Sequence, residues 1–256
     1  MTDIAKDLWL SMRRAFETLG AMALFLFQMV VSVPAALLRF GLVSQQIFNA
    51  GALSLVIIML CGLFIGMVLG LLGFDLAQRI GSEEALGAGA ALALVKELGP
   101  VTTSLLFAGR AGTALASEIG LMRATDQLSA MQMMAVDPVR RVCVPRFLGG
   151  VVAMPLLAVI FSAVGIYGTQ LIGVQVMGVD AGAFWSQMRA AVELEDVMEG
   201  VIKSVAFGIT CSLIAVYEGF NAIPTAEGVG RATTRTVVIS AVATLVLDYI
   251  LTAAML

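Results

Sequence analysis

The sequence predicts an all-α, polytopic membrane protein in which an N-terminal interfacial helix precedes five transmembrane helices. Of the 256 residues, 60% are hydrophobic and only 13% are charged, about half the charged share of a soluble protein. Predominantly apolar segments long enough to cross a bilayer, about 20 residues each, recur along the chain. Because these segments fill most of the length, we expect residues 1–256 to form a single membrane domain.

The N-terminal segment, residues 1–40, has the pattern of a helix that lies in the membrane interface. Apolar residues recur at helical spacing while charged residues take the other faces. The run Ala21–Leu38 leaves two alternatives open, because Gln28 and Pro34 interrupt it and Arg39 closes it. We expect a re-entrant or tilted interfacial helix, and a true span is the alternative. The apolar positions are Ile4, Leu8, Met12, Phe16 and Leu19.

The five predicted transmembrane helices lie within residues 47–256. The first carries Gly62, Gly66 and Gly70, four residues apart, which form a groove where another helix can approach closely. That neighbour is either a helix of the same chain or a helix of a second copy. The predicted spans are Ile47–Leu72, Ala85–Phe107, Phe147–Val174, Val201–Tyr217 and Thr236–Leu256, with polar connections at 74–84, 110–146, 178–199 and 218–235.

The distribution of Lys and Arg predicts the orientation of these helices. Of the 15 basic residues, 11 fall in the N-terminal segment, in residues 110–146 and in residues 218–235, all on one side of a five-span topology. By the positive-inside rule this side is cytoplasmic, so the N-terminus is cytoplasmic and Leu256 lies on the far side. If residues 21–38 were a full span, Arg39 would leave the basic side, so the charge distribution favours five spans.

The residue inventory excludes most enzyme chemistry. The chain has no His, which excludes His-based acid–base catalysis, a Ser-His-Asp triad and His metal ligands. The nearest approach to a P-loop, Gly200–Ser204, lacks the glycine that precedes the lysine. The three cysteines have no C-x-x-C spacing, and no basic block of the kind that nucleic acid requires is present. We therefore expect no catalytic residue, no metal, no cofactor and no nucleic-acid partner.

Charged residues inside the predicted helices are the first candidate functional residues, because each costs about 2.5–3.5 kcal/mol at the bilayer centre. Glu97 lies about 18 Å along the second helix, and its neighbour Lys96 points about 100° away from it. One of the two is expected to line a cavity. Lys203 begins the fourth predicted helix and Asp248 lies within the fifth, in the same half of the membrane. We predict a Lys203–Asp248 ion pair; the alternative for Lys203 is snorkelling to the interface.

Residues 110–146 are the second candidate region. They have helical periodicity, and charged and amide side chains stand beside methionines, a combination that suits the docking of a soluble partner. The alternative is an interfacial helix whose methionine face touches only lipid. The polar residues are Glu118, Arg123, Asp126 and Gln127, and the methionines are Met122, Met131, Met133 and Met134.

Several stretches of the chain form one recognisable set of motifs. They are Gly62-Leu-Phe-Ile-Gly66-Met-Val-Leu-Gly70, Lys96-Glu97-Leu-Gly-Pro100-Val, Phe107–Gln127, Met133–Pro138, Pro145-Arg-Phe147, Ala222-Ile-Pro224-Thr and Gly230–Val238. Together they resemble the MlaE-type permeases, the membrane subunits of the ABC transporter that maintains outer-membrane lipid asymmetry in Gram-negative bacteria. The likeness covers nearly the whole chain and is far more specific than any lone motif.

The resemblance implies a homodimeric permease in the bacterial inner membrane with a periplasmic C-terminus. Its partners would be two cytoplasmic ATPase subunits of the MlaF type, a STAS-domain protein of the MlaB type and a periplasmic MCE hexamer of the MlaD type. The helix Arg123–Met134 would be the coupling helix that docks on the ATPase. A phospholipid cavity would lie between the first, second and fifth helices of both protomers, with Leu69 and Phe74 near its mouth and Lys96 and Glu97 at its polar depth.

The sequence therefore predicts an ABC permease that moves phospholipid between the inner membrane and a periplasmic MCE carrier, with ATP hydrolysed by a partner. One departure from the family pattern is Lys96, where some members carry Arg; lysine keeps the charge but not a bidentate grip on phosphate. The runner-up function is an autonomous secondary transporter with Glu97 and Asp248 as proton carriers. A nonenzymatic scaffold is the third. Co-purification of an ATPase with the chain discriminates between these functions.

Overall fold

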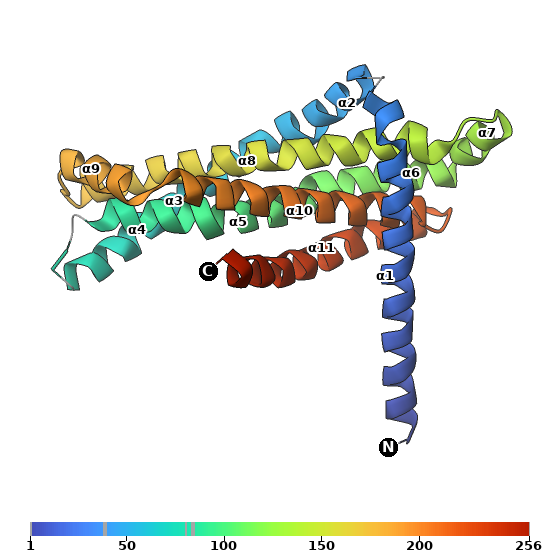
Figure 1. The fold of residues 1–256 in the computed structure, drawn as a ribbon, viewed down its shortest axis with the longest axis horizontal. Helices are drawn as coiled ribbons and strands as arrows, with labels where there is room; N and C mark the ends of the chain where they lie inside the picture. The colour runs from blue at the N-terminus through green and yellow to red at the C-terminus, as the bar shows by residue number, and fades with distance from the viewer. Residues whose placement is uncertain (1, 38–39, 80, 83–84, 256) are drawn as a thin grey trace.

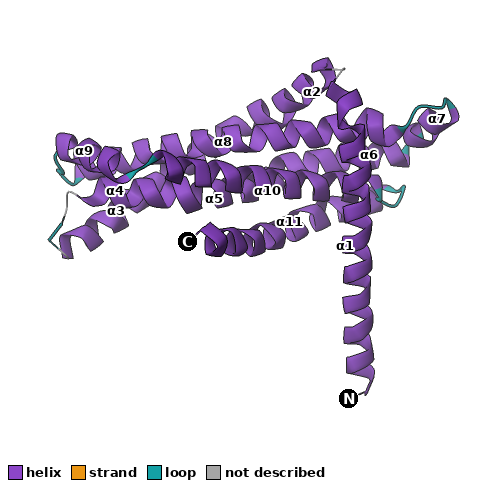
Figure 2. Cartoon of the chain, viewed as in Figure 1, coloured by secondary structure: helices purple, strands orange, loops and turns teal. Residues whose placement is uncertain are grey.

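The computed structural model describes residues 2–37, 40–79, 81–82 and 85–255, and every regular element in these ranges is helical. Long helical segments run along one another in an elongated bundle, and α1 runs across one end of it (Figure 1). The loops lie mainly at the two ends of the bundle (Figure 2). The elements are α1 (Thr2–Leu37), α2 (Phe40–Ile47), η1 (Phe48–Ala52), α3 (Leu53–Arg79), α4 (Leu86–Leu92), η3 (Ala93–Leu98), α5 (Gly99–Phe107), η4 (Ala108–Gly112), α6 (Thr113–Ala124), α7 (Gln127–Met133), η5 (Val139–Cys143), α8 (Val144–Gln170), η6 (Leu171–Val176), α9 (Ala181–Ala191), α10 (Leu194–Phe220) and α11 (Ala226–Met255), where η marks a π-helical segment.

Six helical segments of the described chain are long and apolar enough to cross a membrane. Five of them match the five predicted spans, of which only the end residues Ala85 and Leu256 fall outside, and the sixth lies in α1, where we expected an interfacial helix. The segments are Phe16–Pro34, Gly41–Arg79, Leu86–Ala124, Val139–Val176, Leu194–Phe220 and Ala226–Met255. Length and composition thus allow α1 to span, but its course lies across the other five (Figure 1).

The predicted polar connections are largely helical, which corrects the expected helix ends. Helix α3 continues to Arg79, the second long helix continues to Ala124, and only residues 221–225 separate α10 from α11. Residues 178–199 contain α9 and the first six residues of α10, so Lys203 lies well inside its helix rather than at its start. A helix can continue with polar side chains once it leaves the hydrocarbon core of the membrane. The end of an apolar run therefore indicates where the helix leaves the membrane and not where the helix ends.

Helix α1 packs on the bundle with one face only. Met22, Phe25 and Met29, spaced three and four residues apart, are buried against the bundle, whereas Leu24 and Phe27 on the other face are exposed. Helix α1 contacts η5, α8 and α10. The side chains of Ile4, Leu8 and Met12, which belong to the predicted apolar face, lie outside the described residues, as does Arg39.

Helix α3 packs tightly against α8 through the three glycines of the predicted groove. Gly62, Gly66 and Gly70 are buried, and a Cβ atom at Gly66 would overlap the backbone of Gly165 on α8. The hydroxyl of Thr169 on α8 donates a 2.9 Å hydrogen bond to the Gly66 carbonyl oxygen. Within this chain, then, a helix of the same chain fills the groove, as in small-residue packing of membrane helices.

Hydroxyl groups join the other helices inside the bundle. Ser104 on α5 lies 2.8 Å from the Thr244 hydroxyl on α11 and 3.3 Å from the Cys211 sulfur on α10. Ser162 on α8 donates a 3.0 Å hydrogen bond to the Leu94 carbonyl oxygen in η3. Such bonds satisfy polar groups where water is absent and fix helices relative to one another.

The first prediction tests the α3–α8 contact. Gly66→Ala should lower the free energy of unfolding by about 1–3 kcal/mol, because the added methyl group meets the Gly165 backbone and the helices must separate. The measurement is the unfolding temperature of the purified protein in detergent. Gly109→Ala is the matched control, since a Cβ atom there has open space. Equal unfolding temperatures for the two variants would contradict the tight packing.

Candidate functional site

Three charged residues on α10 face the π-helical segment η3. Asp196, Glu199 and Lys203 are separated by three and four residues, which places them on one side of the helix. The opposing segment η3 carries Lys96 and Glu97 side by side. Lys96 pairs with Asp196 and Glu199 near the start of α10, and Glu97 pairs with Lys203 about one turn further along. We call these five residues the charge ladder.

Lys203 is the centre of the ladder. Its side chain is 1% exposed, and its Nζ atom lies 2.7 Å from Glu97 Oε1 and donates a 2.8 Å hydrogen bond to Thr252 Oγ1. The Thr252 hydroxyl in turn lies 3.3 Å from Glu97 Oε1. Asp248 Oδ1 lies 3.9 Å from the same Nζ atom. Lys203 therefore joins η3, α10 and α11.

Lys96 forms the outer rung of the ladder. Its Nζ atom lies 3.0 Å from Asp196 Oδ1 and 2.9 Å from Glu199 Oε2. Asp196 also accepts a hydrogen bond from the Glu193 backbone N–H in the capping box that begins α10. The start of α10 and its charge pairing thus depend on the same carboxylate.

The ladder brings together residues that sequence reasoning treated separately. The nearest carboxylate to Lys203 is Glu97 and not Asp248, and Lys96 and Glu97 do point to different partners, as their adjacent positions require. Asp196 and Glu199 were missed, because residues 178–199 were interpreted as a loop. The signal that could have found them is their helical spacing to Lys203.

The ladder and Asp248 carry excess negative charge and are only partly covered by the chain. Four carboxylates oppose two lysines, and the side chains of Glu97 and Asp248 keep exposed fractions of 38% and 23%. In addition, Asp248 Oδ1 accepts no hydrogen bond within the described residues. Charged groups inside a membrane must face protein or water, so this side of η3 and α11 does not face lipid hydrocarbon.

An apolar cavity of 480 Å³ lies between α3 and the helix that follows it. Leu69 lines it, together with Leu72, Leu76 and Gly89, and its lining extends to Ala93, the first residue of the segment that carries Lys96 and Glu97. Phe74 is not part of this lining. It packs instead with Leu86, Val179 and Phe184 at the end of the bundle.

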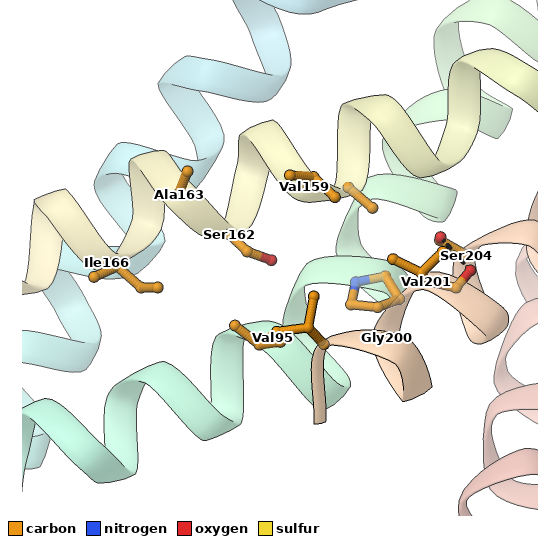
Figure 3. Close-up of a pocket in the computed structure, with 11 residues that line it drawn as sticks. Val95, Val159, Ser162, Ala163, Ile166, Gly200, Val201 and Ser204 are labelled. Atoms are coloured by element: carbon orange, nitrogen blue, oxygen red, sulfur yellow. Dashed lines mark hydrogen bonds between the residues drawn. The ribbon is translucent and has the colours of Figure 1, made fainter. Parts of the chain in front are cut away.

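A second cavity, of 210 Å³, lies between η3, α8 and α10 (Figure 3). Its wall consists mainly of small and branched apolar side chains, among them Val95, Ala163 and Val201. The hydroxyls of Ser162 and Ser204 are both bonded to backbone carbonyl oxygens. No charged side chain lines this cavity, so it lacks the groups that would orient a charged ligand.

The polar residues of the second candidate region lie at the end of the bundle that carries α7 (Figure 1). Arg123 donates to the Phe220 carbonyl oxygen, and Glu118 pairs with Arg146 at 3.2 Å, so both have partners within the chain. Asp126 has a φ of 56° and turns the chain into α7. Gln127 is exposed; of the methionines, Met131 is partly buried on the core, and Met133 and Met134 are exposed.

These features define a class of protein: a polytopic helical membrane protein with a charge ladder inside its bundle. The chain matches the family model described as Permease MlaE over residues 43–254. It is 50% identical over 241 residues to the intermembrane phospholipid transport system permease protein MlaE of Haemophilus influenzae, covering 94% of this chain and 92% of that protein.

More distant relatives extend the comparison. A probable ABC transporter permease protein of Rickettsia typhi is 33% identical over 236 residues, covering 92% of this chain and 91% of that protein. The chloroplastic protein trigalactosyldiacylglycerol 1 of Arabidopsis thaliana is 31% identical over 207 residues, covering 81% of this chain and 59% of that protein. The chain belongs to the MlaE permease family.

The second prediction ranks the partners of Lys203. Lys203→Met should destabilise the protein by about 1–3 kcal/mol, because it leaves the partly exposed carboxylates of Glu97 and Asp248 without their cation. In double-mutant cycles, the coupling of Lys203→Met with Glu97→Gln should exceed its coupling with Asp248→Asn, since the distances are 2.7 Å and 3.9 Å. Unfolding in detergent measures both couplings. Additive losses in both cycles would show that the charges do not interact.

Proposed function

We propose that this chain is the permease subunit of an ABC transporter that moves phospholipid between the inner membrane and a periplasmic MCE carrier. The close relative from Haemophilus influenzae is named as an intermembrane phospholipid transport permease, and the Rickettsia relative as a probable ABC transporter permease. The MlaE family is a family of permeases, so ATP hydrolysis belongs to a partner subunit. The names of these relatives therefore favour an ATP-driven permease over an autonomous proton-coupled transporter.

The observation that carries the proposal is the charge ladder beside an apolar cavity. A phospholipid has a charged headgroup and apolar chains, so a path for it needs polar and apolar surfaces next to each other. The partly exposed carboxylates of Glu97 and Asp248 and the ammonium of Lys96 offer the polar surface, and the cavity lined by Leu69 offers the apolar one. A second copy of the chain facing η3 and α11 would cover the exposed charges and make the path two-sided.

The orientation follows from the charges at the two ends of the bundle. The α7 end also holds the α10–α11 turn (Figure 1). The elements that adjoin these two segments carry six basic residues, so we assign this end to the cytoplasm. They are Arg123, Arg140, Arg141, Arg146, Arg231 and Arg235. Helix α1 then lies along the cytoplasmic interface, because it crosses the bundle (Figure 1), buries Met22, Phe25 and Met29 against it, and exposes the charged pair Arg13–Glu17. The C-terminus and α9 belong to the periplasmic side.

Helix α7 is the proposed coupling helix for the ATPase. It is a short helix at the tip of the bundle, and Met133 and Met134 have exposed fractions of 84% and 68% beside the exposed Gln127. Exposed methionines form an adaptable apolar surface for a partner. The remaining proposed partners are a STAS-domain protein in the cytoplasm and an MCE hexamer in the periplasm.

The third prediction tests transport. Vesicles that contain the chain with its co-purified ATPase and a fluorescent phospholipid should exchange lipid with a soluble MCE carrier only when ATP is hydrolysed. Glu97→Gln should slow this exchange at least about tenfold, because it removes the carboxylate that holds Lys203. Glu227→Gln is the matched control, since it removes the same charge from an exposed pair near the start of α11. Exchange that follows a proton gradient without ATP would contradict the proposal.

The fourth prediction tests the coupling helix. Met133→Ser with Met134→Ser should weaken co-purification of the ATPase by about tenfold or more, because two exposed apolar side chains are lost from the docking surface. The helices should stay folded, since neither side chain is buried. Arg123→Glu should weaken docking too, but through the lost hydrogen bond to Phe220 between α6 and α10, and should therefore lower the unfolding temperature as well. Full ATPase recovery with the double methionine variant would exclude α7 as the contact.

A further inference from the structure

A polar pocket of 210 Å³ lies between the first and second long helices, away from the charge ladder. Two π-helical segments, η1 and η4, contact each other at this place. The polar groups that line the pocket are the side chains of Gln46, Asn49, Arg110 and Glu118. π-Helical turns are rare and often occur at functional sites, because they redirect a side chain out of the regular helix face.

Arg110 is the unusual residue of this pocket. Its Nη1 atom donates to the Asn49 carbonyl oxygen at 2.9 Å and to the Ser54 hydroxyl at 3.2 Å. Among the described residues, no carboxylate lies within 4.0 Å of the guanidinium, and Nε and Nη2 have no hydrogen-bond partner. The nearby acid, Glu118, is paired with Arg146. The pocket therefore contains a half-buried cation with unused donors and a net charge of +1 from these three groups.

The depth of Arg110 in the membrane suits a lipid headgroup. It lies 24 residues after Leu86, which is about 36 Å along the helix and beyond a hydrocarbon core of about 30 Å. Leu53 lines the same pocket and is 58% exposed, and Phe48, the neighbour of Asn49 in η1, is 63% exposed. Polar donors thus meet a lipid-facing apolar surface at headgroup level.

We propose that this pocket binds the phosphate group of a membrane phospholipid. Nε and Nη2 of Arg110 donate to two phosphate oxygens, the side-chain amides of Gln46 and Asn49 donate to the others, and the acyl chains lie over Phe48 and Leu53. Planar guanidinium donors match phosphate geometry, and basic pockets between membrane helices bind anionic headgroups. The site does not depend on the proposed transport function, because binding needs neither ATPase nor carrier.

The test measures binding to the purified full chain in detergent by native mass spectrometry and by titration, with dioleoyl phosphatidylglycerol as the lipid probe and inorganic phosphate as the free-anion probe. Arg110→Gln should weaken lipid binding by about tenfold or more, because charge-assisted hydrogen bonds are lost. Asn49→Leu should weaken it about threefold while the backbone carbonyl that holds Arg110 remains. Arg141→Gln, which removes an exposed positive charge, should bind as the unchanged protein does.

The outcomes separate the possible ligands. Lipid binding that both pocket variants weaken, and that 10-fold excess inorganic phosphate over lipid does not displace, supports the lipid site. If the protein binds inorganic phosphate but not the lipid, and Arg110→Gln abolishes this binding, the lipid proposal is wrong and the ligand of the pocket is a soluble anion. Equal lipid binding by the unchanged protein, Arg110→Gln and Asn49→Leu would overturn the pocket altogether. Asn49→Leu keeps the test decisive if Arg110→Gln unfolds.

Discussion

The buried ammonium group of Lys203 is the constraint on which the arrangement of the membrane helices depends. It is almost fully enclosed, and its partners Glu97 and Thr252 come from η3 and α11. A buried charge that loses its partner costs several kcal/mol. If α10 moved by one helical turn, about 5.4 Å, the ammonium would lose both contacts. One side chain thus fixes the relative positions of three elements that are far apart in the sequence.

Helix α8 joins this charged part of the bundle to α3 by a different kind of interaction. On one side its Gly165 and Thr169 meet Gly66, where the absence of side chains lets two backbones touch. On the same side of α8, about one turn before Gly165, Ser162 bonds to Leu94, two residues before Lys96. Close packing between glycines does not by itself fix how far one helix is shifted along the other. The hydrogen bonds of Thr169 and Ser162 therefore set the position of α8 along α3 and η3. The bundle therefore combines an electrostatic contact at η3 with a van der Waals contact at α3.

The sequence sufficed to predict the five long helices and four charged residues of the candidate site, but it missed Asp196, Glu199 and Thr252 and the pairing of the charges. Apolar runs and intramembrane charges are local properties, so Glu97, Lys203 and Asp248 could be selected without a structure. Their pairing depends on helix extent, which polar segments conceal. Because α10 begins at Leu194, Asp196 and Glu199 share a helix face with Lys203. The roles of Thr252 and of the Phe220 carbonyl have no sequence signal, since a threonine in an apolar helix and a backbone oxygen look ordinary.

The segment Leu86–Ala124 connects the charge ladder to the α7 end of the bundle through one helix. It holds Glu97 against α10 and α11 at η3, Arg110 against η1 at η4, and Arg123 against α10 near the turn to α7. Two of these three contacts coincide with a π-helical segment. A π-helical turn weakens the regular hydrogen-bond pattern locally, so these are the places where this helix can bend at least cost. In the function that we propose, a force that the ATPase applied at α7 would reach the charge ladder along this backbone, and the first contacts strained would be those of Arg123 and Arg110.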